Sequence, residues 1–266
     1  EILGAPELDL EFAVDEPVAL VAVRLNDVFP DGTSAQVTYG VLNLTHRESH
    51  ENPQPLERGK RYRVRLKLND IAHHFHPGHV IRVAISTSYW PMVWPSPRAT
   101  KLTVFTSGSA LKLPVRPPRE SDASLAPFLP PEAAPTSTSK MPLRPYRFIR
   151  TYERDLITND TVYRLFSEGG DLETGAVMHM DAINLDLGHT VERRFSIGET
   201  DPLSAKAEIT ERLMMRRDEW RIRVHALTRL SADEEYFHLY ARLDAHEGEE
   251  PVFSREWNEK IKRELV

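Results

Sequence analysis

The N-terminal part of the sequence alternates hydrophobic and polar residues with a period of two. In Arg61–Leu68 every second residue is hydrophobic and the residues between them are basic. Such a pattern places the hydrophobic side chains on one face of a β-strand and the charged ones on the other. His79–Ser86 repeats the alternation, with Ile81, Val83 and Ile85 expected to point inward.

Further strand-like segments and turns complete this half of the chain. Val18–Val23 is hydrophobic without alternation, as expected of a strand covered on both faces, and Lys101–Thr106 is a short candidate strand. The turns Phe29–Gly32, Glu57–Lys60 and His76–His79 contain glycine, two of them with proline, which set or permit tight backbone angles. Many short strands without intervening helices predict a β-sandwich, jelly roll or barrel over residues 1–113.

A proline-rich stretch over residues 114–145 separates the two halves of the chain. It holds nine of the 20 prolines, and proline lacks the amide hydrogen that a β-ladder needs. We therefore predict an extended, partly polyproline-like linker that includes the polar run Thr136–Ser139. Its hydrophobic residues Leu125, Phe128 and Leu129 favour docking on a neighbouring surface, and a free tether is the alternative.

After the linker, residues 146–266 contain longer segments separated by short polar breaks. Such breaks join neighbouring antiparallel strands, so we predict a β-meander, either separate from the first domain or packed on it. The predicted strands are Tyr146–Ile157, Val162–Phe166, Ala176–Leu187, Glu192–Ile197, Ala205–Met215, Trp220–Leu230, Tyr236–His246 and Val252–Trp257. Leu203–Met215 is also rich in helix-forming residues, so a helix is the alternative there.

The composition is that of a globular protein of about two domains, with 266 residues, 40% of them hydrophobic and 28% charged. A net charge of -6 gives no general attraction to nucleic acid or to an anionic membrane. No hydrophobic run approaches the ~18 residues of a membrane span. The absence of cysteine excludes disulfides, thiolate metal sites and a cysteine nucleophile, and it fits the reducing cytoplasm, where we expect the protein.

Glycine spacing argues against a catalytic domain within these residues. A nucleophile elbow, Gly-x-Ser-x-Gly, and a dinucleotide loop, Gly-x-Gly-x-x-Gly, both need spacings that none of the 12 glycines provides. Gly170 and Gly175 begin like a phosphate-binding loop, but Ala176 and Val177 stand where Lys and Ser or Thr are required. We therefore predict no catalytic residue and no cofactor. Because Glu1 opens directly on a strand-like pattern, we expect the chain to be part of a larger protein.

Four segments of the first half carry a resemblance to a known family. They are Ala22–Gly32, Val37–Arg47, Pro77–Val83 and Ser86–Pro91. In order and spacing they resemble the C-terminal jelly-roll domain of α/β-hydrolases of the cocaine-esterase and Xaa-Pro dipeptidyl-peptidase kind, over roughly residues 1–110. The resemblance implies a galactose-binding-like sandwich that packs against a separate catalytic domain with a serine, histidine and aspartate triad. No triad residue can be assigned in this chain, and residues 146–266 resemble the extra C-terminal region of a subset of these hydrolases.

His73, His74, His76 and His79 place four imidazoles within seven residues. Imidazole is the commonest ligand of transition metals. Neighbouring residues of an extended chain point to opposite faces, however, and the nearest acid in the sequence is Asp70. We therefore favour a polar loop between strands over a metal site, and no bound metal is predicted.

Tyr89–Pro97 is an aromatic loop stiffened by proline, and it contains Tyr89, Trp90 and Trp94. Such side chains anchor protein interfaces, fill cores or stack on sugar rings in some jelly rolls. The resemblance favours an interface with the hydrolase domain, with a core role and glycan binding as alternatives.

A second polar loop contains His46 and Arg47. A general base needs a nucleophile within hydrogen-bond reach and an orienting partner, and local spacing suggests neither. An ion pair within the chain or a contact with the hydrolase domain is therefore predicted for these two residues.

Two groups of basic residues are predicted to be solvated surfaces. The first follows one face of a strand without aromatic residues on that face, which binding to a nucleic-acid backbone would need, and it would discourage sheet aggregation. It comprises Arg61, Arg63, Arg65 and Lys67. The second is balanced by nearby acids and comprises Arg212, Arg216, Arg217, Arg221 and Arg223.

The sequence therefore predicts an all-β protein with a jelly-roll sandwich over residues 1–113, a linker over 114–145 and an antiparallel β region over 146–266. The predicted function is that of the non-catalytic C-terminal β region of a serine hydrolase acting on ester or amide bonds, which packs on and stabilises its own α/β-hydrolase domain. A stand-alone carbohydrate-binding β-sandwich is the alternative. No nucleic-acid or membrane partner is predicted, and the oligomeric state and the substrate are left open.

Overall fold

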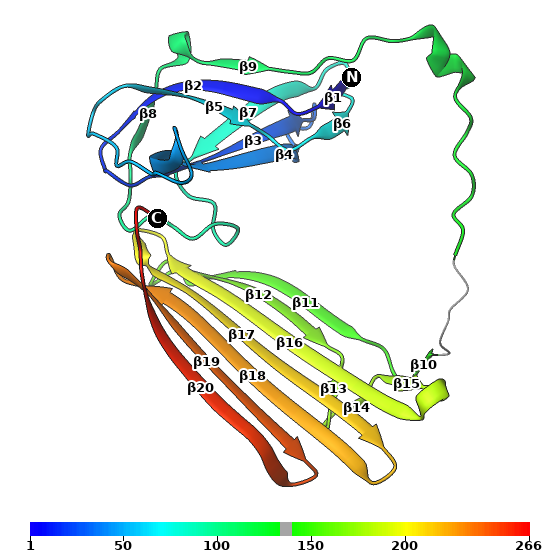
Figure 1. Ribbon diagram of the computed structural model, residues 1–266. Helices are drawn as coiled ribbons and strands as arrows, with labels where there is room; N and C mark the ends of the chain where they lie inside the picture. Colours follow the sequence, from blue (N-terminus) through cyan, green and yellow to red (C-terminus); the bar gives the residue numbers. More distant parts are fainter. Residues whose placement is uncertain (134–139) are drawn as a thin grey trace. The chain divides into compact units, whose positions relative to one another are not determined.

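A computed structural model describes residues 1–133 and 140–266. The chain divides into two compact units (Figure 1). Unit 1 comprises Glu1–Pro130 with Leu265–Val266, and unit 2 comprises Pro131–Glu264. Over the described residues the regular structure consists of β-strands and short 3-10 helices, without an α-helix, so the all-β prediction is confirmed. No helix in these ranges is long and apolar enough to cross a membrane.

Unit 1 is built from short antiparallel strands. They are β1 (Ile2–Gly4), β2 (Glu7–Val14), β3 (Leu20–Val28), β4 (Ser34–Asn43), β5 (Tyr62–Lys67), β6 (Ile71–His73), β7 (Val80–Ser86), β8 (Leu102–Val104) and β9 (Ala110–Lys112). One sheet has the order β5-β2-β8, with β9 also paired to β2, and a second has the order β4-β3-β7. The strands β1 and β6 form a separate pair.

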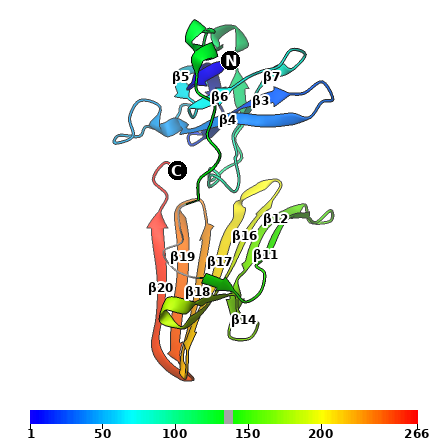
Figure 2. The same cartoon turned by 90° about the vertical axis from the view of Figure 1, so that its right-hand side faces the viewer.

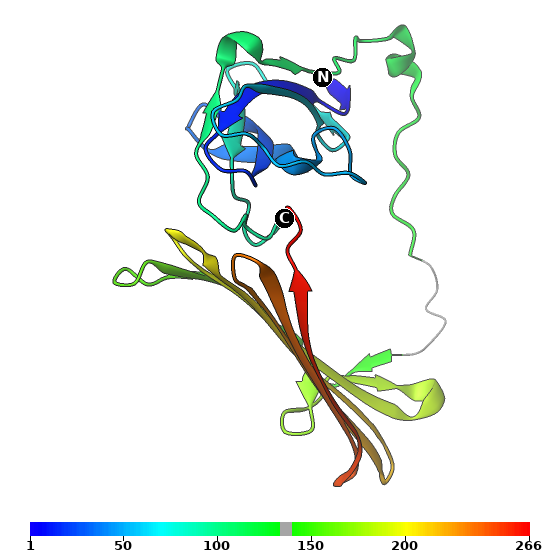
Figure 3. The same ribbon diagram turned by 60° about the vertical axis from the view of Figure 1, so that its left-hand side comes forward.

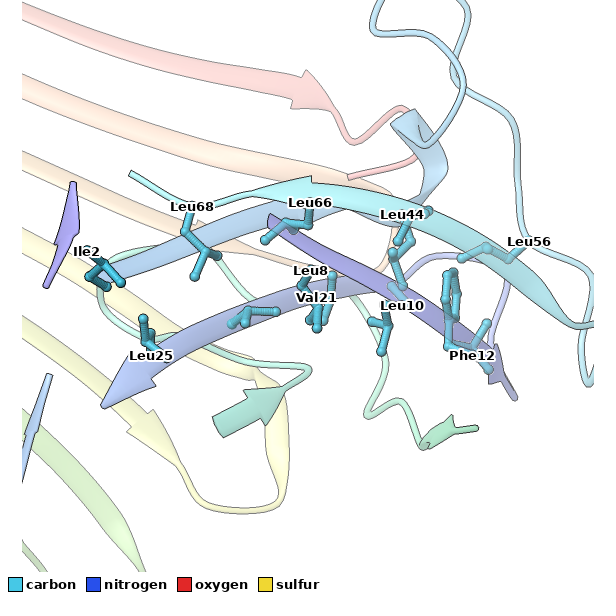
Figure 4. Close-up of a cluster of buried hydrophobic side chains, with 14 residues drawn as sticks. Ile2, Leu8, Leu10, Phe12, Val21, Leu25, Leu44, Leu56, Leu66 and Leu68 are labelled. Carbon is cyan, nitrogen blue, oxygen red and sulfur yellow. The ribbon is translucent and has the colours of Figure 1, made fainter. Parts of the chain in front are cut away.

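The core of unit 1 lies between these two sheets (Figure 4). Leu8, Leu10 and Phe12 of β2 are buried against Val21 and Leu25 of β3, because alternate residues of each strand face inward. Burial of a continuous set of aliphatic side chains supplies the main stabilisation of such a sandwich.

The strand predicted at His79–Ser86 is present as β7, but its inward face is less buried than expected. Val83 and Ile85 pack against the core, whereas Ile81 is 44% exposed. The register places Ile81 opposite Asp27, near the end of β3 where the inward face becomes polar. Ile81 therefore shares the inward face of β7 with Val83 and Ile85, but it lies outside the buried core.

The basic stripe of β5 is an outer strand face, as predicted, and it is paired with acids of the neighbouring strand. Arg65 Nε lies 2.8 Å from Asp9 Oδ1, and Arg63 Nη2 lies 3.6 Å from Glu11 Oε2. The hydrogen bonds from Arg65 and then Lys112 lower the pKa of Asp9 to about 2. These exposed cross-strand pairs fix the charges on the surface of the sheet and contribute little stability each.

The predicted linker is partly described. Residues 114–133 contain one short 3-10 helix, η3 (Glu120–Ser124), and the side chains of Leu125, Phe128 and Leu129 are exposed, so the docking predicted for them is not observed. The polar run Thr136–Ser139 lies outside the described residues. Where the description resumes, Lys140–Pro142 forms the strand β10, paired with β15 of unit 2 (Met178–Met180).

Unit 2 contains a nine-stranded antiparallel sheet and a small hairpin (Figures 1 and 2). The further strands of the sheet are β11 (Arg147–Arg154), β12 (Asp160–Glu168), β16 (Leu185–Gly198), β17 (Asp201–Arg217), β18 (Trp220–Ala232), β19 (Tyr236–Glu247) and β20 (Glu250–Lys262). The order runs β10-β15-β16-β17-β18-β19-β20, and β11-β12 joins at β16. Figure 3 shows that the long strands form one twisted layer.

One strand prediction in unit 2 was wrong, and the strand predicted at Ala205–Met215 is confirmed as part of β17. Ala176–Leu187 is not one strand, because Asn184 adopts a positive φ of 47° at the end of the 3-10 helix η4 (Asp181–Ile183) and breaks the extended backbone. The helix alternative for Leu203–Met215 is also excluded, since these residues lie in β17, which pairs with β16 on one side and β18 on the other. Glu192–Ile197 is part of the longer strand β16.

A small hairpin covers part of one face of this sheet. It consists of β13 (Gly170–Asp171) and β14 (Gly175–Ala176). It approaches β16 closely: the amide of His189 donates to the Gly169 carbonyl at 2.9 Å, and the Thr190 hydroxyl donates to the Gly170 carbonyl at 3.1 Å. Val177 and Met214 are buried beside it, so the hairpin encloses the most buried part of unit 2.

Candidate interface on unit 1

Tyr89 packs on the outer face of the β4-β3-β7 sheet. Its hydroxyl donates to Gln36 Oε1 at 2.9 Å, and its ring lies 5.6 Å from the ring of Tyr39. The Arg24 guanidinium sits over the same ring at 5.4 Å. Because Arg24 and Tyr39 are opposite each other on β3 and β4, the sheet register brings these groups together.

Trp90 and Trp94 contact each other and are half-buried. Their ring centroids are 5.1 Å apart and their planes make an angle of 83°, an edge-to-face arrangement. Met92 between them is 61% exposed. The loop therefore presents one flexible apolar side chain to solvent, with its two indoles packed against each other.

The same outer sheet face holds buried polar atoms that the described residues do not satisfy. Arg24 Nε and Asn26 Oδ1 are buried and have no hydrogen-bond partner among the described residues. Buried polar groups without partners are uncommon and each costs free energy. Both residues belong to the segment that carried the family resemblance, at positions that alternate with the inward-facing Val23 and Leu25, and this alternation was the signal that could have identified them.

His46 and Arg47 lie in a different loop and contact their own surroundings. Arg47 Nη1 donates to the carbonyl of Gln54 at 2.7 Å and to that of Leu44 at 3.2 Å, and its guanidinium lies 4.6 Å from the ring of Tyr62. Arg47 therefore fastens its loop by hydrogen bonds to backbone carbonyls rather than by the predicted ion pair. His46 Nδ1 lies 3.3 Å from His50 Nδ1.

The histidine cluster has an acid partner that sequence proximity did not reveal. Asp27, whose side chain is 3% exposed, lies 3.0 Å from His73 Nε2 and 2.8 Å from His79 Nδ1. Burial by itself raises the pKa of Asp27, but the hydrogen bonds from His79 and His73 outweigh burial and hold the pKa below its usual value. His74 and His76 instead stack on each other, with centroids 4.7 Å apart. In the described part of the chain no group of three or more acidic, histidine or cysteine side chains is arranged to hold a metal ion.

Unit 2 has a hollow of about 510 Å³ beneath the hairpin, lined by β17 to β20. One of its carboxylates is firmly engaged: Asp244 accepts from Arg242 at 2.8 Å and from the Ser254 hydroxyl at 2.7 Å. Partial burial and then the neighbouring Arg212 lower the pKa of His225 in this hollow. Because the serine is bonded to an aspartate, the hollow lacks the serine–histidine contact of a nucleophilic site.

Two antiparallel sheets around one core make unit 1 a β-sandwich domain, in which no grouping of side chains described above forms a nucleophilic site. Residues 1–119 match the family model of the X-Pro dipeptidyl-peptidase C-terminal non-catalytic domain.

The chain is also similar to individual proteins over part of its length. Over 68 residues it is 37% identical to cocaine esterase of Rhodococcus sp. (strain MB1 Bresler). These residues make up 26% of this chain and 12% of the esterase. Among solved structures, an α-amino acid ester hydrolase labelled with selenomethionine aligns with a TM-score of 0.42 at 24% identity, covering 43% of this chain and 23% of that one. An aminopeptidase of a marine sediment archaeon, Thaumarchaeota archaeon, aligns with a TM-score of 0.41 at 22% identity, covering 42% of this chain and 23% of the aminopeptidase. The chain thus spans only a small part of each of these proteins.

Proposed function

We propose that this chain is the non-catalytic β region of a larger serine hydrolase that acts on ester or amide bonds. Its role is to pack on the α/β-hydrolase domain of the same protein and stabilise it. The match of residues 1–119 to the model of a non-catalytic domain supports the non-catalytic role. The proposed activity follows that of cocaine esterase, to which the chain is similar over 68 residues, and that of the X-Pro dipeptidyl-peptidases named in the family model.

The observation that carries the proposed contact is the group of buried, unsatisfied polar atoms on the outer face of β4-β3-β7. A partner that supplies an acceptor to Arg24 Nε and a donor to Asn26 Oδ1 would remove both costs. The adjoining Tyr89 and Trp90 provide the aromatic anchors that protein interfaces use. We propose this face, extended by Trp94 and by the loop of His46 and Arg47, as the surface for the catalytic domain.

A carbohydrate-binding module is less well supported by this geometry. A sugar ring stacks on an open aromatic face, whereas Trp90 and Trp94 are packed edge to face against each other. Tyr89 is engaged with Arg24 and Tyr39. The full protein is proposed to act in the cytoplasm, in keeping with the absence of cysteine, and without a nucleic-acid or membrane partner.

The isolated 266-residue chain is expected not to hydrolyse a chromogenic short-chain ester, because it has no nucleophile elbow. Initial rates with and without a serine-reactive phosphonate measure this. Turnover that the phosphonate abolishes would contradict the non-catalytic role. The proposal also requires that the gene encode a Gly-x-Ser-x-Gly motif upstream of Glu1, and a coding region without one would overturn it.

In the protein that includes the catalytic domain, Arg24→Ala combined with Tyr89→Ala is expected to shorten the half-life of esterase activity at elevated temperature by about tenfold, the effect of losing one interface hot spot. The matched control is Arg65→Ala, an exposed arginine on the outer face of the other sheet. Equal half-lives for both variants would place the catalytic domain elsewhere. Circular dichroism of the isolated chain checks that the double variant retains the sandwich.

A further inference from the structure

The strand β20 (Glu250–Lys262) ends the large sheet of unit 2 and has a free edge. It pairs with β19 on one side, and no other described strand pairs with it (Figure 2). Every residue of β20 is exposed except Trp257, which is half-buried. A long exposed edge strand presents a row of unused amide and carbonyl groups, which can pair with another strand.

The hydrogen bonds to β19 determine which residues of β20 direct their backbone amides and carbonyls away from the sheet. The amide of Arg263 donates to the Glu235 carbonyl at 2.7 Å, and the register continues with Lys262 opposite Tyr236. In an antiparallel ladder only alternate residues bond to the same neighbour. From Phe253 onward, odd-numbered residues of β20 therefore bond to β19, and even-numbered residues direct their amides and carbonyls outward.

The side chains of β20 are self-complementary around Trp257. On the face shared with Leu243 and Ala245 of β19, a hydrophobic residue and a charged residue stand on each side of Trp257, with opposite charges on the two sides. In chain order they are Phe253, Arg255, Trp257, Glu259 and Ile261. The hydrophobic residues at the two ends are 47% and 51% exposed, respectively.

We propose that β20 binds β20 of a second copy of this chain, antiparallel, about a two-fold axis at Trp257. This pairing places Arg255 opposite Glu259 of the second copy and Phe253 opposite its Ile261, each twice by symmetry. In this register the even-numbered residues, whose backbone groups point outward, lie opposite even-numbered residues of the second copy. Residue 254 is opposite 260 and residue 256 is opposite 258, each twice by symmetry, and these four pairs form about eight backbone hydrogen bonds. The proposal is independent of the proposed function, because it rests on unit 2 alone.

The two charged residues are available for this contact. In the described part of the chain neither Arg255 nor Glu259 forms an ion pair, and the Arg255 guanidinium lies over the ring of Trp257 at 4.9 Å. Opposite charges directly across a strand pair are favourable, and like charges are unfavourable. The Arg255–Glu259 pairs thus select both the partner and the register.

The neighbouring registers that also place even-numbered residues opposite even-numbered residues are less favourable. An axis at Glu256 places Glu256 opposite its own copy and Phe253 opposite Glu259. An axis at Asn258 places Phe253 opposite Arg263. The axis at Trp257 is the register that matches hydrophobic with hydrophobic residues and places no like charges directly opposite each other.

Charge reversal tests the pairing on the full chain. Sedimentation equilibrium is expected to show a reversible dimer, and Arg255→Glu is expected to raise its dissociation constant about tenfold or more, because two attractive pairs become repulsive. The double variant Arg255→Glu with Glu259→Arg restores both attractions and is expected to return the constant to near that of the original chain. A double variant as weak as the single one would overturn the proposed pairing.

Cysteine cross-linking tests the register, since the natural chain has no cysteine and needs no background substitutions. At the axis, Trp257 faces its own copy in a non-hydrogen-bonded pair with Cα atoms about 4.5 Å apart, within the range of a disulfide. Trp257→Cys is therefore expected to form a covalent dimer on mild oxidation, far more than Glu256→Cys or Asn258→Cys. Three results would overturn the proposal. They are a chain that stays monomeric at all concentrations and does not cross-link, larger assemblies formed through β11, which pairs only with β12, and faster cross-linking at residue 256 or 258 than at 257.

Discussion

Replacing Asp27 by alanine is expected to lower the Tm of the full chain by roughly 10 °C, as the loss of a buried hydrogen-bond acceptor shared by two donors implies. His73 and His79 both bond to this carboxylate, and His79 also packs on Phe29 with ring centroids 4.6 Å apart. Without Asp27, two imidazoles at the junction of β3, β6 and β7 lose their partner, and His79, whose side chain is only 10% exposed, has little access to water as a replacement. Differential scanning calorimetry near neutral pH measures the change.

The charge of Asp27 adds a pH dependence with a defined sign. Its pKa is lower in the folded chain than in the unfolded chain, so the stabilisation is complete above the unfolded pKa of about 4 and is lost as the pH falls through the folded pKa. The variant Asp27→Asn keeps the shape and lacks the charge. The Tm difference between the original chain and Asp27→Asn is therefore expected to shrink as the pH is lowered from 6 toward 3.

His74→Ala is the matched control for Asp27, because His74 belongs to the same cluster and is exposed, stacking on His76 without a bond to Asp27. A change within about 2 °C is expected, as for most surface substitutions. If His74→Ala and Asp27→Ala were equally harmful, the cluster as a whole, rather than the buried carboxylate, would hold this end of the sandwich together.

Much of the fold of unit 1 could be predicted because its signals are local. The alternation of Arg61–Leu68 appears as β5, with Val64 and Leu66 in the core. The turn at Phe29–Gly32 is closed by the amide of Gly32, which donates to the Phe29 carbonyl at 2.9 Å. Each of these features depends on a few adjacent residues, so a single sequence contains the information that decides it.

The partners of the histidines could not be predicted, because they depend on pairing between distant strands. Asp70 is nearest in the sequence, but the acid that binds the cluster is Asp27, which is 46 residues from His73 and 52 from His79. The β3–β7 register, which ends with Val28 opposite Val80, brings His79 close to Asp27. The same limit applies to the contact of Arg24 with the Tyr89 ring, because these two residues come from segments that lie far apart in the sequence.

In unit 2 the wrong prediction was a single uninterrupted strand where the chain forms two separate strands. The residues of Ala176–Leu187 favour a strand individually, yet the chain must turn at Asn184 to bring β15 antiparallel to β16.

In unit 1, the acids opposite the basic stripe of β5 were visible in the sequence: Glu7, Asp9 and Glu11 alternate with hydrophobic residues in the manner of a strand partner. Comparing alternating segments in pairs would have predicted those ion pairs.

Gly188→Ala is expected to destabilise the chain by about 2–3 kcal/mol, as overpacking of a closed contact does. A Cβ at this position would lie 2.7 Å from the carbonyl carbon of Gly170 and 2.8 Å from Met214 Cγ. The first contact is with backbone, so the β13–β14 hairpin must move away from β16 rather than a side chain rotating. Urea unfolding measures the stability, and faster amide exchange at His189, which bonds to the Gly169 carbonyl, reports the displaced hairpin.

Gly198→Ala in the same strand distinguishes this steric effect from the general effect of removing a glycine. A Cβ at Gly198 would meet Asp160 Oδ1 at 3.1 Å and Ser204 Oγ at 3.2 Å, both side-chain oxygens that need to shift by only a few tenths of an ångström. Alanine also restricts the unfolded chain more than glycine does, so this variant is expected to be neutral to slightly stabilising. Equal destabilisation by both variants would mean that β16 tolerates no side chain for reasons of strand geometry, and the close approach of the hairpin would then not be what requires glycine at 188.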